Sequence, residues 1–270
     1  MLAQLRVPWA FLVRDFRIET SYKAGFMLRI AGALLNVAIY YFIARAFGGL
    51  ATPYLQAYGG NYFAFVVIGV ACNSYLALGI GAIGNSMRDG QMTGTLELML
   101  LSPTRLAVVL LSSSLWSYLF ATVSMITYLV AGVALGMRLS QANIPVALAS
   151  LGLAIVSFIA LGLFAASIVI LIKNGNPLGW AIRVSSVVLG GVFYPVGVLP
   201  DWLRWLGQAL PLTHALELLR RSMIMGEGLA QLWGEMLALA GLTIVLFPLG
   251  LLACHLAVRF ARIDGSLSHY

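Results

Sequence analysis

Four polar residues in one short stretch have the types and the spacing that could do chemistry. His214 and Glu217 stand three residues apart, so on a helix they share one face and could act as metal ligands or as an acid–base pair. A structural zinc site takes four protein ligands, and no second pair accompanies these two. Arg220 and Arg221 follow Glu217 at i+3 and i+4, which favours ion pairs within one helix. The pattern predicts no metal site and no catalytic residue, although a membrane-embedded enzyme would have to draw on these four.

Two glycine motifs could indicate either nucleotide binding or close helix packing. Gly79, Gly81 and Gly84 match the dinucleotide-binding fingerprint by letters. That fingerprint binds a pyrophosphate only where it follows a buried strand and opens a helix, whereas here it ends an apolar run. Small residues at such spacings favour close packing of membrane helices. We interpret Gly132 and Gly136 in the same way, as helix contacts.

The sequence predicts no ATP site and no ion-coupling site. A P-loop needs Gly-Lys followed by Ser or Thr, but the lysines are Lys23, followed by Ala, and Lys173, followed by Asn. We therefore expect no nucleotide cofactor in this chain. Ion-coupled transporters carry acids near the bilayer centre. The nine acids here fall in terminal segments, loops or span ends: Asp15, Glu19, Asp89, Glu97, Asp201, Glu217, Glu227, Glu235 and Asp264.

The amino-acid composition indicates that most of the surface of this chain contacts lipid rather than water. Of 270 residues, 61% are hydrophobic and 9% charged, with a mean hydropathy of +0.95, against about 25% charged residues in soluble domains. The net charge of +7 comes from basic residues scattered at the ends of apolar stretches, which excludes nucleic acid as a partner. Cys72 and Cys254 lie in apolar runs and are too few for a disulfide framework.

The fold class that follows is an all-α integral membrane protein with a single six-span domain over residues 26–270. Apolar stretches of about 20 residues or more predict transmembrane helices. The spans are expected at 26–47, 62–85, 106–137, 144–172, 177–198 and 236–258.

Residues 1–25 predict an amphipathic helix at the membrane interface. Leu5, Trp9, Leu12 and Phe16 recur at spacings of four, three and four, which places them on one helical face. Basic and acidic residues fill much of the other side. Such a helix lies in the headgroup plane, or alternatively packs as a solvated helix on a partner.

Charge asymmetry predicts the orientation. With the N-terminus inside, cytoplasmic segments hold eleven of the sixteen Lys and Arg residues and outer segments five. The positive-inside bias then places both termini in the cytoplasm of a multi-pass protein of the cell (inner or plasma) membrane.

Residues 194–228 predict a re-entrant or outer-interface hairpin before the last span. Pro195, Pro200 and Pro211 interrupt the stretch, so neither half is long enough to cross. Asp201 and Thr213 are expected to cap two short helices, and Trp202 with Trp205 to anchor them at the interface. Irregular backbone at membrane depth needs protein or a watery cavity around it.

A second short helix is expected in the segment 88–103. Thr95 suits an N-cap, Glu97 lies in the first turn, where an acid is favourable, and Pro103 helps to end the helix. Leu96 and Met99 make one side apolar, so the helix should dock on protein or on the membrane surface.

A family resemblance rests on these two segments. Gly94-Thr95-Leu96-Glu97 followed by Leu101-Ser102-Pro103 resembles the cytoplasmic signature of ATP-binding-cassette type-2 transporter permeases, the membrane subunits of ABC exporters. Tyr194-Pro195 through Leu199-Pro200 and on to Leu210-Pro211-Leu212-Thr213-His214 is similar to that family's motif before the last span. The six expected spans and the amphipathic N-terminus also fit.

The resemblance implies partners and site residues. Segment 88–103 would be the coupling helix, seated in a groove of a separate ATP-binding-cassette ATPase subunit that the N-terminal helix also contacts. That partner subunit, and not this chain, would hold ATP and Mg²⁺. A second permease copy, as a homodimer, and membrane lipids are the other expected partners. The implied coupling residues are Arg88, Asp89, Thr93, Gly94, Thr95, Leu96, Glu97, Leu98, Met99, Ser102 and Pro103. The residues expected along the hairpin and the substrate path are Tyr194, Pro195, Pro200, Trp202, Pro211, His214, Glu217 and Arg220.

The function expected from the sequence is that of a permease subunit of an ATP-driven exporter for an amphipathic, drug-like or lipid-linked substrate. A polysaccharide or glycolipid exporter is the alternative within transport. A membrane-embedded lipid-modifying enzyme and a scaffold that anchors a soluble complex are the alternatives outside it.

Overall fold

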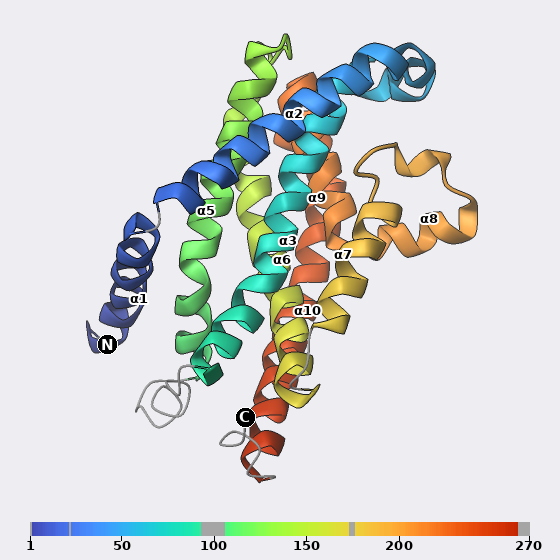
Figure 1. The fold of residues 1–270 in the computed structure, drawn as a ribbon. Coiled ribbons are helices and arrows are strands. Elements are labelled where there is room, and N and C mark those ends of the chain that lie inside the picture. Colours follow the sequence, from blue (N-terminus) through green and yellow to red (C-terminus); the bar gives the residue numbers. More distant parts are fainter. Residues whose placement is uncertain (1, 22, 93–105, 173–175, 264–270) are drawn as a thin grey trace.

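The computed structural model describes residues 2–21, 23–92, 106–172 and 176–263 (Figure 1). Within these ranges the chain is helical and contains no strand. The α-helices are α1 (Leu2–Ser21), α2 (Lys23–Ala51), α3 (Tyr62–Met92), α5 (Leu106–Ala134), α6 (Ile144–Ile172), α7 (Pro177–Leu189), α8 (Asp201–Gln208), α9 (Pro211–Arg220) and α10 (Leu229–Ile263). Shorter pieces are the 3₁₀-helices η1 (Thr52–Tyr58) and η2 (Val196–Val198) and the π-helix η3 (Arg221–Met225).

Several of these helices are long and apolar enough to cross a membrane. In the described part of the chain they are Lys23–Tyr58, Tyr62–Asn85, Leu111–Ala134, Ile144–Ile170 and Leu229–Phe260. They coincide with five of the six expected spans. The prediction of an all-helical, multi-pass membrane protein is therefore confirmed.

The helix in the expected fifth span is shorter than the sequence suggested. α7 has 13 residues and ends at Leu189 rather than at residue 198, so it is about 20 Å long at ~1.5 Å per residue. A hydrocarbon core is about 30 Å thick. The helix stops because Gly191 adopts a positive φ of 79°, which an L-residue rarely takes, and Pro195 follows. The count of six spans stays a prediction.

The bundle has a buried centre and an exposed shell. α3 and α6 form the centre, because 78% and 67% of the residues in their apolar membrane-spanning stretches are buried inside the protein. α10 packs most extensively against α6, and α5 against α3. α2 crosses the face of the bundle obliquely (Figure 1), and 11% of the residues in its apolar stretch are buried. The apolar side chains of α2 and α10 therefore face lipid or another protein.

Close helix packing through glycine is confirmed at Gly79 and Gly132 but not at Gly136, which follows the end of α5 with a φ of 102° and would place a Cβ atom in open space. A Cβ atom at Gly79 would lie 2.5 Å from the Tyr118 hydroxyl, and one at Gly162 would lie 2.7 Å from the Gly79 carbonyl oxygen. A Cβ at Gly132 would lie 3.2 Å from a Val67 methyl group. These glycines let α3, α5 and α6 approach more closely than a side chain would allow.

α1 packs beside α5 (Figure 1). The Phe16 and Trp116 rings meet edge to face, with centroids 5.8 Å apart, while Trp9 is 69% exposed. The aromatic side of α1 is thus only partly covered by the bundle. Its place at a membrane interface stays a prediction.

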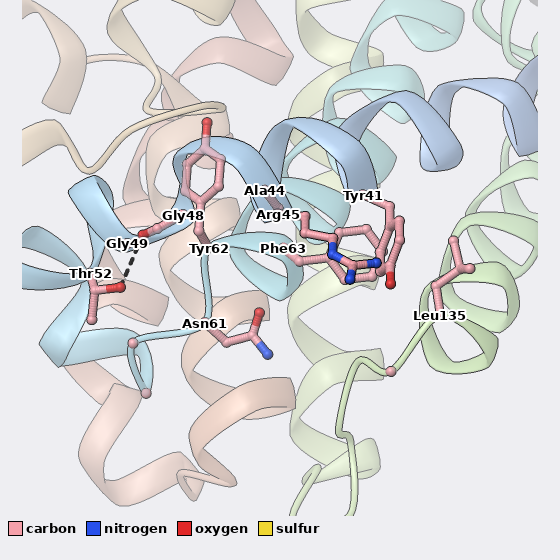
Figure 2. A pocket seen from close by; sticks show the side chains of 13 residues that line it. Tyr41, Ala44, Arg45, Gly48, Gly49, Thr52, Asn61, Tyr62, Phe63 and Leu135 are labelled. Carbon is pink, nitrogen blue, oxygen red and sulfur yellow. Dashed lines mark hydrogen bonds between the residues drawn. The ribbon is translucent and has the colours of Figure 1, made fainter.

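The connection between α2 and α3 turns sharply at one end of the bundle. η1 continues α2, and the Thr52 hydroxyl donates to the Gly48 carbonyl oxygen at 2.9 Å (Figure 2). Gly59 and Gly60 follow with φ of 72° and 69°. Asn61 then caps α3, because its side-chain oxygen accepts from the Ala64 amide at 3.1 Å. This is the upper end in Figure 1, where α5 ends and α10 begins.

Candidate functional site

Residues 194–228, the segment of the expected hairpin, contain a run of short helices between α7 and α10. The placement of this hairpin in or at the membrane stays a prediction. α8 projects from the bundle, and α9 packs against α3, α6 and α10 (Figure 1). Asp201 and Thr213, which were expected to cap the two short helices, have other roles in the structure. Asp201 is the first residue of α8 rather than its N-cap, and it pairs with Arg204 at 3.4 Å. α9 begins at Pro211, and the Thr213 hydroxyl donates to the Gly207 carbonyl oxygen at 2.6 Å, which ties α9 to the end of α8.

The hairpin residues with aromatic and proline side chains shape its outer part. Trp202 and Trp205 are both exposed on α8. The Tyr194 hydroxyl donates to the Val188 carbonyl oxygen at the end of α7. Pro195 precedes η2 and Pro200 precedes α8. These residues fix the turns of the hairpin, and none of them contributes a free reactive group.

Arg220, at the end of α9, is a buried anchor. It is 3% exposed, and its guanidinium donates to the carbonyl oxygens of Phe65 at 3.2 Å, Gly191 at 2.8 Å and Val192 at 2.8 Å. The guanidinium also lies over the Phe65 ring, 3.4 Å from the centroid. Burial lowers the pKa of Arg220 to about 10, so the side chain is charged near pH 7. The ion pair that the sequence allowed between Arg220 and Glu217 is replaced by backbone carbonyls.

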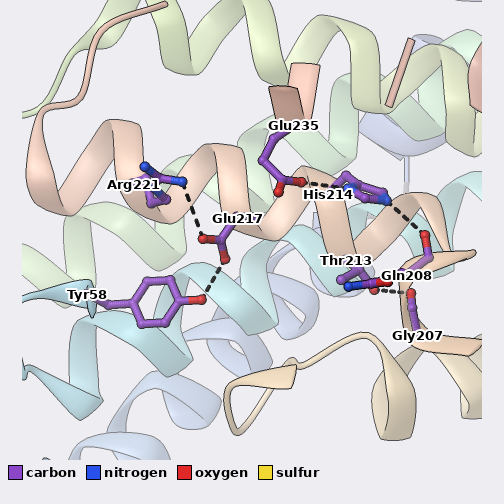
Figure 3. A network of polar contacts seen from close by, with 8 residues as sticks. All are labelled: Tyr58, Gly207, Gln208, Thr213, His214, Glu217, Arg221 and Glu235. Carbon is purple, nitrogen blue, oxygen red and sulfur yellow. Dashed lines mark hydrogen bonds and ion pairs between the residues drawn. The ribbon is translucent and has the colours of Figure 1, made fainter. Parts of the chain in front are cut away.

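Glu217 on α9 and Arg221, the first residue of η3, belong to a partly exposed polar network (Figure 3). The Tyr58 hydroxyl donates to Glu217 at 2.6 Å, which links η1 to α9. Arg221 lies 3.9 Å from Glu217, the i,i+4 pair that the spacing predicted, and 2.6 Å from Glu227. The hydrogen bond with Glu227 raises the pKa of Arg221.

His214 joins α9 to both of its neighbours. Its Nδ1 lies 2.6 Å from a Glu235 carboxylate oxygen on α10, and its Nε2 lies 2.8 Å from the Gln208 carbonyl oxygen at the end of α8 (Figure 3). α10 begins at Leu229, earlier than the expected span, so Glu235 lies in its second turn and faces the hairpin. His214 therefore holds three helices together instead of pairing with Glu217.

A polar cavity of about 170 Å³ lies among these side chains. The charged or titratable groups around it are Tyr58, Arg204, His214, Glu217, Arg220 and Glu235. Among the described residues, no three His, Cys, Asp or Glu side chains cluster as metal ligands would. The cavity has room for water or a small polar group, and its walls come from η1, η2, α8, α9 and α10.

Sequence reasoning brought His214, Glu217 and Arg220 to one site but missed two of their partners. Tyr58 lies 159 residues from Glu217, and Glu235 lies 21 residues from His214. The signal available for Glu235 was an acid near the start of a span, which is costly in lipid unless paired. Nothing in the local sequence marks Tyr58.

The expected coupling residues lie mostly outside the described part of the chain. Arg88 and Asp89 belong to the last turns of α3, which continues to Met92 rather than ending at residue 85. Thr93, Gly94, Thr95, Leu96, Glu97, Leu98, Met99, Ser102 and Pro103 fall outside the described residues. α3 ends and α5 begins at the end of the bundle opposite η1 (Figure 1).

Comparison with known proteins assigns the chain to a family. The family model for the ABC-2 family transporter protein matches residues 52–252, from η1 through most of α10. No curated protein matches the chain. The matched region covers most of the 270 residues and includes both the segment 88–103 and the hairpin. The chain therefore belongs to the ABC-2 transporter family, whose members are membrane permease subunits of ABC transporters.

Proposed function

We propose that this chain is the permease of an ATP-driven exporter that works as a dimer with separate ATPase subunits. The substrate in this proposal is an amphipathic, drug-like or lipid-linked molecule. The observation that carries it is the family match over 52–252, because that range contains the docking-type segment 88–103 and the hairpin together. The family defines a transport subunit rather than a catalytic one.

The arrangement of the described helices supports this assignment of roles. Residues 88–92, the described part of segment 88–103, form the last turns of the central helix α3, whereas the hairpin meets α3 at its start through Arg220 and Phe65 (Figure 1). Movement of an ATPase at one end would be carried along α3, since long helices transmit displacement as rigid units. Arg220 fastens the hairpin to the first turn of α3 through Phe65. The hairpin would then move with α3 when the coupling segment is displaced.

In this proposal segment 88–103 and both termini are cytoplasmic, the chain crosses the inner or plasma membrane six times, and residues 194–228 form a re-entrant hairpin facing outward. Residues 177–198, which begin with α7, would make the fifth crossing, and protein would cover the irregular backbone that follows α7. The exposed apolar surfaces of α2 and α10 are available for lipid and for the second permease copy.

The geometry favours transport over a lipid-modifying reaction at the hairpin. Each of the four candidate catalytic side chains has a structural partner. Arg220 has three backbone carbonyls, and His214 has Glu235 and the Gln208 carbonyl. Glu217 has Tyr58, and Arg221 has Glu227. Groups held in this way stabilise the hairpin and leave little freedom for proton transfer to a substrate. A polysaccharide or glycolipid exporter is the alternative within transport.

The test of this function is ATP hydrolysis with and without the partner. The purified chain is expected to hydrolyse no ATP, to co-purify with a co-expressed ATP-binding-cassette ATPase, and to change that subunit's hydrolysis rate in proteoliposomes. An ATPase with its P-loop lysine replaced is the control, and it should bind the chain but not hydrolyse ATP. Hydrolysis by the isolated chain, or failure to associate with the ATPase, would contradict the proposal.

A further inference from the structure

A second groove, separate from the hairpin cavity, lies at the same end of the bundle between α2, the start of α3 and the end of α5. Its volume is about 490 Å³. Figure 2 shows Arg45 and Tyr41 extending from α2 toward Leu135, with Asn61 and Tyr62 on the other side. The remaining walls are largely glycine, which leaves backbone accessible to a ligand.

The groove carries one positive charge with no protein partner. Arg45 is the single formally charged residue among those that line it. Its side chain is exposed and forms no ion pair or hydrogen bond in the described part of the chain. A guanidinium presents several N–H donors in a planar fork that suits a phosphate or carboxylate. The unpaired positive charge of Arg45 would therefore attract an anion into the groove.

The first turn of α3 adds a second, independent anion-binding element to the groove. Asn61 caps the Ala64 amide and its carbonyl accepts from Phe65, but the amides of Tyr62 and Phe63 have no acceptor among the described residues. Free amides at the start of a helix bind anions, and phosphate in particular. Both residues line the groove that contains Arg45.

An apolar groove continues from the polar one along α2 and α5. It has a volume of about 530 Å³ and is lined by Leu34, Ile126, Thr127, Val130, Ala131, Ala134 and Leu135, of which Leu135 also lines the polar groove. Leu34, Tyr41 and Arg45 are spaced by seven and four residues, so they share one face of α2. From Leu34 to Arg45 is about 16 Å along the helix, similar to one leaflet of a ~30 Å hydrocarbon core.

We propose that these two grooves bind one glycerophospholipid, with its phosphate on Arg45 and the α3 amides and an acyl chain between α2 and α5. A polar anionic site joined to an apolar groove of leaflet length matches an anionic headgroup followed by a hydrocarbon chain. A free phosphate would leave the apolar groove unused, and a neutral lipid would leave Arg45 unpaired. The site goes beyond the proposed function, and its occupancy does not depend on transport.

The site is tested by titrating the purified full chain in detergent with phosphatidylglycerol and measuring the bound lipid by native mass spectrometry. Arg45→Ala is expected to weaken binding by about tenfold or more, the loss typical of a hydrogen bond to a charged group. Arg138→Ala is the matched control, because Arg138 is an exposed arginine shortly after the end of α5 that does not line the groove. This control should bind as the unaltered chain does. Thermal melting without lipid should be the same for both variants, since both side chains are exposed.

Three comparisons decide the class of ligand. Diacylglycerol, which lacks the phosphate, and inorganic phosphate, which lacks the chains, should each bind at least about tenfold more weakly than phosphatidylglycerol. Ala131→Trp, which fills the apolar groove, should reduce phosphatidylglycerol binding without changing the weak binding of inorganic phosphate. Equal losses in Arg45→Ala and Arg138→Ala would overturn the site in favour of general surface charge. Equal affinity for inorganic phosphate or for diacylglycerol would overturn the phospholipid.

Discussion

At the scale of single residues, Arg220 determines how the hairpin attaches to the bundle. A buried charge is costly unless its hydrogen bonds are satisfied, and here three carbonyl oxygens from two different segments accept from one guanidinium. Phe65 belongs to the start of α3, while Gly191 and Val192 follow α7. One side chain therefore joins α3, α7 and α9.

Replacing Arg220 should loosen this junction even when the positive charge is kept. Arg220→Lys retains the charge but loses the planar fork, so at least one buried carbonyl is left unpaired at a cost of about 1–3 kcal/mol. We expect a lower thermal unfolding midpoint in detergent. Arg138→Lys is the control, because Arg138 is exposed. An unchanged midpoint in Arg220→Lys would show that the carbonyls do not need the fork.

The sequence could predict which residues of the site matter but not how they pair. Helical spacing correctly gave the Glu217–Arg221 pair, since both residues lie on one continuous helical segment. The same spacing equally allowed Glu217–Arg220, and only tertiary packing against Phe65 and Val192 selects the backbone partners. Contacts such as Tyr58 with Glu217 join distant segments, so no local pattern could contain them.

At the scale of helices, apolar length predicted the spans well and irregular segments poorly. A run of more than 20 apolar residues has one stable solution in lipid, a helix, and α3 and α6 begin at the positions expected for their spans. The length of α7 was overestimated, because apolar residues continue past Leu189 while Gly191 at positive φ ends the helix. Hydropathy cannot register that change of backbone conformation.

The contact between α3 and the segment after α7 depends on the absence of a side chain at Gly69. A Cβ there would clash with the carbonyl oxygen of Val192 and would lie 2.6 Å from an Arg220 nitrogen. Gly69→Ala should therefore displace the backbone that Arg220 binds and lower the unfolding midpoint. Gly152→Ala is the matched control, because a Cβ at Gly152 would have no neighbour within 4 Å. Equal effects of the two changes would contradict the close contact.

At the scale of the whole molecule, the proposal places the hairpin outside and the opposite end of α10 in the cytoplasm. Single cysteines in a background with Cys72→Ala and Cys254→Ala test this. Asp201→Cys is expected to react with a membrane-impermeant maleimide from the outer side, because the Asp201 side chain is 96% exposed. Arg259→Cys, near the other end of α10, should react only after the membrane is opened. The reverse pattern would contradict the topology.

In the proposed mechanism, transport requires contact between segment 88–103 and the ATPase, and a charge reversal within this segment tests that contact. Glu97→Lys puts a cation in the first turn of the expected coupling helix, unfavourable by roughly 0.3–1 kcal/mol. Loss of a desolvated partner would add about 2–5 kcal/mol. Asp201→Lys makes the same charge change at the exposed hairpin and is the control.

The measurement is the affinity of each purified variant for the ATP-binding-cassette ATPase, with membrane insertion checked in parallel. We predict normal insertion for both variants, an affinity at least about tenfold lower for Glu97→Lys, since ~1.4 kcal/mol corresponds to a factor of ten, and an unchanged affinity for Asp201→Lys. Full affinity in Glu97→Lys would contradict the assignment of this segment and, with it, the proposed mechanism.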